Sequence, residues 1–410
     1  MPRRPYKPLP LPEHHVTDPS ALAACVDHLS RHTLVGFDTE FVGEDTYRPD
    51  LCLIQVSTAE RLFVIDPFDA GPLGSFWELL HDPKRTVIVH AGREEVRLSR
   101  FQSGSPPGAL FDMQIAAGLI GLTYPIGYAG LVQTVLGSRL NKGDTLSDWR
   151  RRPLSDSQIR YAYDDVRYLI PAYEKVHKRL TQYDRLGWAA EEFGEFIGRA
   201  TAADVSEDRW RRVKGSGGLG RRELAVVKAL YEWRDGVAER RNRPARTVMR
   251  DDVLVEVARR GARAPDDLHE LRGIPRGEAE AITRAVRAAN AIPVSQCPPR
   301  VLSEQDPPQV AVLGALLNVV LTDVCERLRL AQSLVCSMQD LKDLVRARQP
   351  GGELPGDSPF RAGWRRQVIL PHLERVLDGN LMVRVTNSQT PAPLEYIEPI
   401  VDADDEEGEV

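Results

Sequence analysis

The chain has 410 residues, which is too long for one hydrophobic core and predicts two or three domains. Its apolar fraction of 42% and charged fraction of 28% are ordinary for a soluble globular protein. The five cysteines show neither CxxC pairing nor the spacing of zinc ligands, so a disulfide framework is not expected. The net charge of −5 does not by itself indicate a nucleic-acid partner.

The N-terminus and the longest apolar run give no sign of secretion or of a membrane span. The N-terminus is basic and proline-rich but lacks the apolar segment of a signal peptide. The run from Val310 to Leu321 contains Asn318 and is shorter than the ~20 residues that a spanning helix needs. We expect a cytoplasmic protein without a membrane segment, acting as a monomer.

The first part of the chain predicts an α/β fold. Short polar turns separate three apolar runs, which predicts antiparallel strands at Thr33–Phe41, Leu51–Ser57 and Leu62–Ile65. A fourth strand, Thr86–His90, leads into a helix at Arg93–Phe101, and Asp112 is a candidate N-cap for a helix at Met113–Leu122. We expect a mixed sheet with flanking helices.

The rest of the chain has helical spacing. Ser155–Arg179 reads as one helix, and Ala225–Arg241 is strongly amphipathic. Further helices are predicted at Asp252–Arg260, Pro265–Leu271, Arg276–Asn290, Gln309–Leu328, Ser337–Ala347 and Ser358–Asp378.

Composition divides the chain into six segments. We expect a flexible N-terminus at 1–14, an α/β domain at 15–195, a helical domain at 205–291, a proline-rich linker at 292–308, a second helical domain at 309–380 and an acidic tail at 381–410. Between Arg209 and Arg287 there are 20 Lys and Arg residues against 12 Asp and Glu residues, a local charge of +8. The first helical domain is therefore a candidate polyanion-binding surface.

Asp38 and Glu40 end the first apolar strand. Residues two apart on a strand point to the same face, so both carboxylates can reach one cation, whereas Thr39 faces the other way. Two like charges on an apolar strand are costly unless a cation or a partner neutralises them. An isolated pair of this kind also arises by chance at a strand end in solvent, so the pair needs support from other residues.

That support comes from the helix at Ser155–Arg179. Tyr161 and Asp165 lie four residues apart and share one face, whereas Asp164 points one step around the helix. With one carboxylate from the helix Arg93–Phe101, four acidic groups can converge. Hard oxygen ligands suit Mg²⁺ or Mn²⁺, and two such ions about 3.5–4 Å apart can clamp the attacking and leaving oxygens of a phosphodiester.

Five motifs occur in order over residues 15–195: F-D-T-E-F, H-A-G-R-E-E-V-R-L, F-D-M-Q-I-A-A, S-D-W-R-R-R-P-L and Y-A-Y-D-D-V-R-Y-L. They resemble ribonuclease D, of the Tyr-containing branch of the DEDD exonuclease superfamily. The resemblance implies a ribonuclease H-like fold and metal-dependent 3′→5′ hydrolysis of RNA to nucleoside 5′-monophosphates. It implies that Asp38, Glu40 and Asp165 are metal ligands and that Tyr161 orients the attacking water. The implied substrate is the 3′ end of a tRNA precursor or another structured RNA.

The second motif departs from the family pattern. The family has Asp five residues after the His, and counted from His90 that residue is Glu95 here. Glu95 keeps the charge and the oxygen ligand, so we expect it to be the fourth metal ligand, with Glu94 as a neighbour that is not a ligand. The extra methylene shifts the reach of the carboxylate, on whose placement catalysis depends. A non-catalytic or impaired RNA-binding relative therefore stays open.

Four residues are candidates for substrate contact: Gln55, His90, Lys142 and Arg150. Three of them have a plain alternative. Gln55 can be an exposed strand residue, His90 a core histidine, and Arg150 the start of a solvated basic run. Lys142 lies in a loop-like segment before Tyr161, in which Trp149 is expected to be a packing anchor.

The first helical domain carries a second resemblance. Trp210, the segment Tyr231-Glu232-Trp233-Arg234, Arg240–Pro244 and Leu271–Ile274 are similar to the helicase-and-RNase-D C-terminal (HRDC) domain. This implies accessory nucleic-acid binding, in agreement with the local positive charge. Residues 309–380 occupy the place of a second, divergent HRDC domain on helical pattern alone.

A 3′→5′ exonuclease that acts on DNA also stays open as an alternative function. No short motif in the sequence indicates whether the site recognises the 2′-hydroxyl group of RNA.

Overall fold

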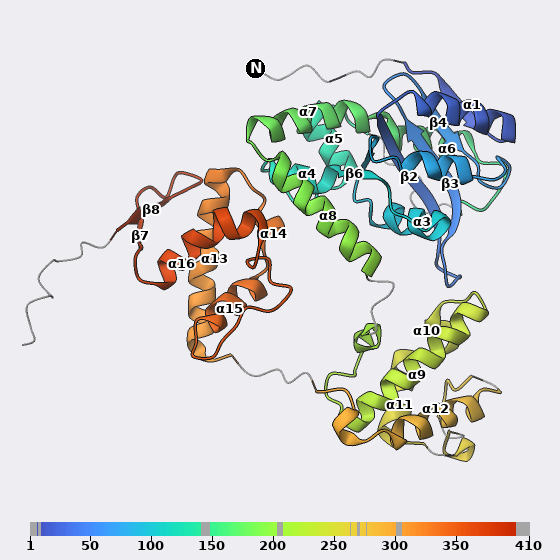
Figure 1. Cartoon of the computed structure of the whole chain (residues 1–410), viewed down its shortest axis with the longest axis vertical. Helices are drawn as coiled ribbons and strands as arrows, with labels where there is room; N and C mark the ends of the chain where they lie inside the picture. Colours follow the sequence, from blue (N-terminus) through green and yellow to red (C-terminus); the bar gives the residue numbers. More distant parts are fainter. Residues whose placement is uncertain are drawn as a thin grey trace, which may run out of the picture.

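The computed structural model describes residues 6, 10–140, 148–202, 208–262, 264–268, 271–275, 277–300 and 306–398. Within these ranges the chain forms an α/β domain and two helical units. Figure 1 shows the α/β domain in blue and green, the first helical unit in yellow-green and the second in orange.

A six-stranded mixed sheet forms the centre of the α/β domain, which confirms the predicted fold class. Its strand order is β1-β4-β3-β2-β5-β6; the β2–β3 and β3–β4 pairs are antiparallel, and the other pairs are parallel. The strands are β1 (Glu13–Val16), β2 (Leu34–Val42), β3 (Asp50–Ser57), β4 (Leu62–Ile65), β5 (Thr86–Val89) and β6 (Ala109–Asp112). The edge strands β1 and β6 were not predicted, because β1 is mostly polar and β6 has no β-branched residue, whereas the equally short β4 and β5 are rich in such residues.

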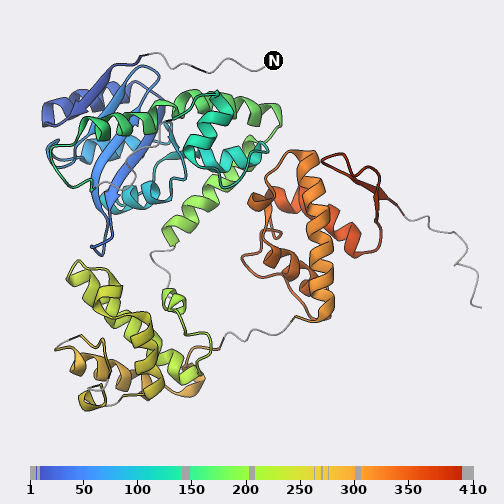
Figure 2. The ribbon, with the colours of Figure 1, turned by 180° about the vertical axis from the view of Figure 1, so that it is seen from behind.

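Helices cover both faces of this sheet (Figure 2). Val35 and Phe37 of β2 share an apolar cluster with α1 (Pro19–Ser30), α2 (Gly74–Leu80) and α3 (Arg93–Ser103). The opposite face and the adjoining core are covered by α4 (Met113–Leu119), α5 (Tyr128–Leu136), α6 (Asp156–Arg167), α7 (Leu169–Gln182) and α8 (Leu186–Ala202). A Cβ atom at Gly36 would lie 3.1 Å from Leu169, so the even-numbered residues of β2 face α6 and α7.

The predicted helix Ser155–Arg179 is two helices. α6 ends at Arg167, Tyr168 caps it, and α7 begins at the next residue. The last helix of the domain, α8, runs to Ala202 and therefore passes the expected domain end at residue 195.

The first helical unit has a core around Trp210 and Leu230. Its helices are α9 (Arg221–Arg240), α10 (Ala245–Val248), α11 (Asp251–Arg260) and α12 (Ala279–Ala291), with single 3₁₀ turns η1 (Arg209–Arg212), η2 (Pro265–Leu268) and η3 (Val294–Gln296). Cys297 is buried in the same core, so the first part of the expected linker packs on the bundle.

The second helical unit contains α13 (Pro308–Leu328), α14 (Gln332–Val335), α15 (Met338–Ala347), the π-helical turn η4 (Arg365–Ile369), α16 (Leu370–Leu377) and a hairpin of β7 (Met382–Val385) and β8 (Leu394–Ile397). The hairpin was not predicted, and residues 382–397 are not part of an acidic tail. Buried Asp323 holds it, because its carboxylate accepts hydrogen bonds from Tyr396 Oη at 2.8 Å and Leu394 N at 3.2 Å. The acidic residues beyond 398 lie outside the described residues.

One helix in the described part of the chain, α13, is long and apolar enough to cross a membrane. Its 21 residues exceed the apolar run seen in the sequence. Val310, Leu317, Val320, Leu321 and Val324 are buried in the protein core, as expected for the central helix of a bundle.

Both helical units contact the α/β domain. Glu192 of α8 accepts hydrogen bonds from Trp364 Nε1 at 2.8 Å and Arg365 Nη2 at 3.0 Å, and the rings of Trp188 and Trp364 stack at 4.8 Å. The first helical unit contacts the β2–β3 loop, where the Tyr47 hydroxyl donates a hydrogen bond to Asp235 of α9 at 2.8 Å. The loop beside the end of β2 is thus in direct contact with the first helical unit.

Candidate active site

β2 carries Asp38 and Glu40 on the face that α6 covers. Burial, and next the charge of Glu40, raises the pKa of Asp38 to about 7. Burial, and next the charge of Glu95, raises the pKa of Glu40 to about 7. The strand therefore presents two carboxylates whose ionisation is opposed by their surroundings and by a third acid.

α6 brings Asp165 to the same place. The helix starts with a capping box formed by Ser155 and Gln158, and its inner side buries Ala162 and Val166. Burial, and next the charges of Asp38 and Glu40, raises the pKa of Asp165 to about 9. Its Oδ2 atom is buried and has no hydrogen-bond partner in the described part of the chain.

The neighbouring Asp164 has a different environment. Its Oδ1 atom accepts a hydrogen bond from Arg167 Nε at 2.7 Å, within the same helix. The structure therefore separates the two adjacent acids, with Asp165 directed to the acidic cluster and Asp164 to an ion pair.

Glu95 joins the cluster from the first turn of α3. Its Oε1 atom accepts a hydrogen bond from the Thr39 hydroxyl at 2.8 Å. Burial, and next the charge of Asp38, raises the pKa of Glu95 to about 8, and the Thr39 hydrogen bond acts against this rise. The two-residue period of the strand placed Thr39 on the face opposite to Asp38 and Glu40. The hydrogen bond between Thr39 and Glu95 was not predicted, because the two residues are 56 positions apart.

The start of α3 is itself held in place. Asp112 caps α4, accepting hydrogen bonds from Gln114 N at 2.8 Å and Ile115 N at 3.2 Å, and it also accepts one from Gly92 N at 2.8 Å. The predicted N-cap is therefore confirmed, and it additionally anchors the turn before Glu95. Glu94 forms an ion pair with Arg97 at 2.9 Å.

The donor set of this cluster fits divalent cations. Four carboxylates come from β2, α3 and α6, of which that of Glu95 is buried and the other three are partly buried. The leading charge effects on them come from one another. Carboxylates that repel one another in this way can all be ionised only when positive charge lies nearby, and oxygen donors suit hard cations.

Gln55 lies directly beside Asp38. The two residues are register partners across the β2–β3 pair, so their side chains share one face of the sheet. Gln55 is fully buried, and neither of its amide atoms has a hydrogen-bond partner among the described residues. The expectation of an exposed strand residue is therefore wrong, and an unpaired buried amide of this kind costs about 1–3 kcal/mol.

His90 and Tyr128 border the same cluster. His90 Nε2 donates a hydrogen bond to Ile126 O at 3.0 Å, and burial lowers the pKa of His90 to about 4, so its ring is neutral. The Tyr128 ring lies 5.4 Å from the His90 ring. Burial, and next the charges of Asp165 and Asp38, raises the Tyr128 pKa. Tyr128 was not predicted, because its spacing from the acidic motifs gives no signal.

The basic run after Trp149 is divided between different partners. Arg150 pairs with Asp45 of the β2–β3 loop at 2.9 Å, and Arg152 pairs with the buried carboxylate of Asp66. Arg151 is largely exposed and forms an ion pair with Asp148 at 3.5 Å. Trp149 is buried with its ring 6.0 Å from that of Tyr161, which confirms the predicted packing anchor. Lys142 lies outside the described residues.

Comparison with known proteins agrees with this geometry. The family described as 3′-5′ exonuclease matches residues 14–181, and the HRDC domain family matches residues 223–288. Ribonuclease D of Gluconacetobacter diazotrophicus is 34% identical, with 91% of this chain and 95% of that protein covered. The chain belongs to the ribonuclease D family. Ribonuclease D of Acidiphilium cryptum is 37% identical over 88% of this chain and 92% of its own length.

The structural comparison extends through the helical units. The crystal structure of Escherichia coli RNase D, described as an exoribonuclease involved in structured RNA processing, aligns with a TM-score of 0.77 and 28% identity. The alignment covers 89% of this chain and 98% of the other. As a member of the ribonuclease D family, the chain is a 3′→5′ exoribonuclease that acts on RNA, and 3′→5′ exonucleases of this kind depend on divalent metal ions.

Proposed function

We propose that Asp38, Glu40, Glu95 and Asp165 hold two divalent cations, Mg²⁺ or Mn²⁺, at the 3′ end of an RNA chain. The observation that carries this proposal is the convergence of four buried or partly buried carboxylates whose pKa values are all raised. When bound, the two ions supply positive charge to the scissile phosphate and lower the pKa of the attacking water.

Tyr161 is proposed to orient that water. It lies one helical turn before Asp165, and the Trp149 ring packs 6.0 Å from its own. A tyrosine hydroxyl held in this way can accept or donate a hydrogen bond to the water while the carboxylates hold the metal side of the site. Attack on the last phosphodiester then releases a nucleoside 5′-monophosphate and leaves a 3′-hydroxyl on the shortened RNA.

Two further residues are proposed to contact the terminal nucleotide. Gln55 offers a buried amide without a partner beside Asp38, and His90 offers an unpaired buried Nδ1 atom. Both are neutral groups that can hydrogen-bond to RNA without adding charge to the acidic cluster. Arg150 is a weaker candidate, because Asp45 and Asp148 already neutralise its guanidinium.

The substrate is proposed to be the 3′ end of a structured RNA, such as a tRNA precursor, processed by a cytoplasmic monomer. The first helical unit supports this with its local charge of +8 and its contact with the β2–β3 loop. We propose that residues 15–202 are the catalytic domain, that 208–297 form the HRDC domain, and that 308–380 are a second, divergent HRDC domain. The Escherichia coli relative is described as acting in structured RNA processing.

Metal stoichiometry tests the proposal directly. Mn²⁺ binding to wild-type protein should give two equivalents by equilibrium dialysis or electron paramagnetic resonance. Asp38→Asn should lose at least one equivalent, whereas Asp164→Asn, the matched change of the neighbouring acid, should keep both. Equal Mn²⁺ uptake by wild type and Asp38→Asn contradicts the assignment.

A further inference from the structure

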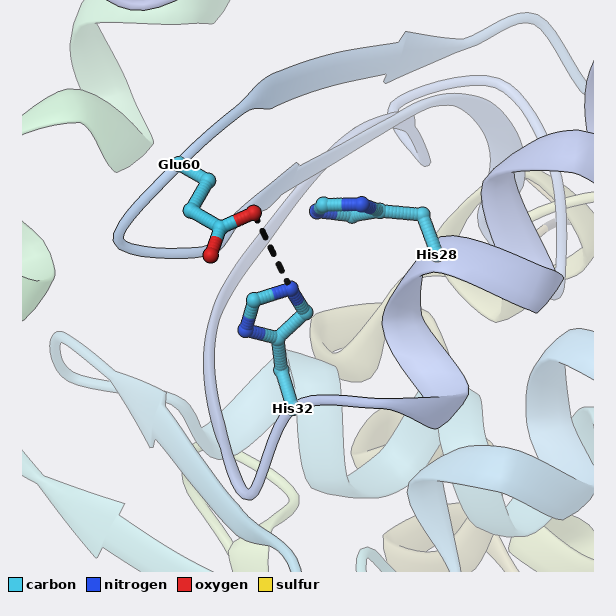
Figure 3. Close-up of side chains that lie close together, drawn as sticks. All are labelled: His28, His32 and Glu60. Carbon is cyan, nitrogen blue, oxygen red and sulfur yellow. Dashed lines mark ion pairs between the residues drawn. The ribbon is translucent and has the colours of Figure 1, made fainter.

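A second cluster of metal-ligating side chains lies away from the active site. His28 is in the last turn of α1, His32 lies two residues beyond that helix, and Glu60 is in the β3–β4 turn. Figure 3 shows both imidazole rings and the carboxylate directed toward one another. One ligand atom from each residue lies within 4.8 Å of the other two, and the described ranges contain no other group that meets this condition.

The spacing is close to that of a metal centre. Ligands about 2.0–2.2 Å from a tetrahedral Zn²⁺ ion lie about 3.3–3.6 Å from one another. His32 Nε2 and Glu60 Oε2 are 3.7 Å apart, and the centroids of the two imidazole rings are 4.5 Å apart. Side-chain rotations that shorten the longest separation by about 1 Å are sufficient to close the site.

The backbone holds the three residues in this arrangement. The N–H of His32 donates to Leu29 O at 3.0 Å, which continues the helical turn and keeps His32 beside His28. In the β3–β4 turn, the Thr58 hydroxyl accepts hydrogen bonds from Glu60 N at 3.2 Å and Arg61 N at 3.1 Å. The same hydroxyl lies 3.0 Å from His28 Nε2, so one side chain connects the turn with α1.

The protonation state also favours a metal. Burial, and next the charges of His32 and Arg61, lowers the pKa of His28, so this imidazole is neutral near pH 7, the form that ligates. The positive groups nearby are Arg31, which pairs with Asp27, and Arg61. The positive charges of these arginines weaken the binding of any cation, so a bound ion must form strong bonds to its ligands.

We propose that His28, His32 and Glu60 bind one transition-metal ion of the zinc class and thereby join α1 to the β3–β4 turn. Two imidazoles and one carboxylate suit Zn²⁺, Ni²⁺ or Cu²⁺, whereas Mg²⁺ and Ca²⁺ prefer oxygen ligands alone. The site is distinct from the acidic cluster. Ser57, which pairs with Gly36, ends β3, and Glu60 lies in the turn beyond this end. Glu40 of the acidic cluster pairs with Leu53, which is nearer the other end of β3.

Co²⁺ titration of the full-length protein tests this site, because tetrahedral Co²⁺ absorbs visible light. The Asp38→Ala protein, with the active-site metals weakened, is compared with the same protein carrying in addition His32→Ala, Glu60→Ala or the control change His177→Ala. His32 is partly exposed and His177 is a partly exposed histidine elsewhere in the domain, so both variants are expected to fold, which circular dichroism checks.

We expect one equivalent of visible-absorbing Co²⁺, displaced by Zn²⁺ and not by excess Mg²⁺. His32→Ala should abolish this signal, Glu60→Ala should weaken binding at least about tenfold because one of three ligands is removed, and His177→Ala should leave it unchanged. No visible Co²⁺ signal in the Asp38→Ala protein, or an undiminished signal in folded His32→Ala, overturns the proposal.

Discussion

The hydroxyl of Thr39 donates a hydrogen bond to Glu95 Oε1 at 2.8 Å, from the face of β2 opposite to Asp38 and Glu40. The strand that carries two proposed metal ligands thus also positions the third. Glu95 stands where the family pattern has Asp, and the hydrogen bond fixes the longer side chain. The extra methylene is therefore accommodated by a specific contact.

Thr39→Val is expected to weaken catalysis without unfolding the protein. The Thr39 hydrogen bond lowers the pKa of Glu95, so its removal raises that pKa further above its present value of about 8. A hydrogen bond to a charged group is worth about 1.5–3 kcal/mol, which corresponds to a reduction of about 10- to 100-fold in kcat/KM at pH 7. The acidic limb of the pH–rate profile should move to higher pH, and Thr39→Ser should restore it. An unchanged profile in Thr39→Val contradicts this role.

Substitutions of Glu95 distinguish the effect of its carboxylate charge from the effect of its side-chain length. Glu95→Ala removes the proposed ligand and should abolish turnover, whereas Glu95→Asp restores the family residue and should keep or raise it. Single-turnover rates with Mg²⁺ and with Mn²⁺ measure both effects. Activity in Glu95→Ala equal to wild type would exclude Glu95 from the metal site.

Asp165→Asn should stabilise the metal-free protein at alkaline pH. Asp165 has a folded-state pKa of about 9, raised above its ordinary unfolded value, so the folded state binds more protons. The stability that this protonation contributes is complete below about pH 4 and is lost as pH rises through about 9. In EDTA at pH 8.5, we expect a higher Tm for Asp165→Asn than for wild type and no such gain at pH 4. A lower Tm for Asp165→Asn at pH 8.5 is the contradictory result.

Much of the candidate site could be predicted from local spacing. Asp38 and Glu40 lie two apart on a strand, and Tyr161 and Asp165 lie four apart on a helix, so both pairs followed from secondary-structure periods. Gln55 was misread because its burial depends on α6 packing over the sheet. The partner of Arg150 could not be found because Asp45 is 105 residues away.

The same limit applies to the fold. Strands β2 to β5 and the amphipathic helices were predicted, but the edge strands β1 and β6 and the hairpin of β7 and β8 were not. Docking of the second helical unit depends on Glu192 meeting Trp364 and Arg365 about 170 residues later. No local pattern encodes such pairings, because each side chain reads as an ordinary surface or core residue by itself.

Removal of exposed arginines from the first helical unit should weaken RNA binding and leave hydrolysis of short oligomers intact. Arg240 and Arg243 are exposed at the α9–α10 connection, where Asn242 accepts a hydrogen bond from Tyr47 N of the β2–β3 loop of the α/β domain. Each arginine that no longer neutralises a phosphate should reduce the slope of log K against log salt by about 0.7–0.9. Filter binding of Arg240→Gln/Arg243→Gln to a structured RNA over a salt series measures this slope.

Arg384→Gln is the matched control for that experiment, because Arg384 lies in the hairpin and pairs with Glu395. Point changes are preferable to removing everything after residue 202, since α8 and the second helical unit share buried contacts. Equal salt slopes for the double variant and wild type would show that these arginines contact no phosphate.

The central claim, that the carboxylates of β2, α3 and α6 perform metal-dependent hydrolysis from the 3′ end, is tested most directly by one assay. Purified wild type and Asp38→Ala are incubated with RNA labelled at its 3′-terminal nucleotide, with Mg²⁺ or Mn²⁺ and with EDTA. We predict release of labelled nucleoside 5′-monophosphate by wild type with metal, and a reduction to the EDTA level in Asp38→Ala. Equal release by the two proteins, or release by wild type in EDTA, would contradict the account.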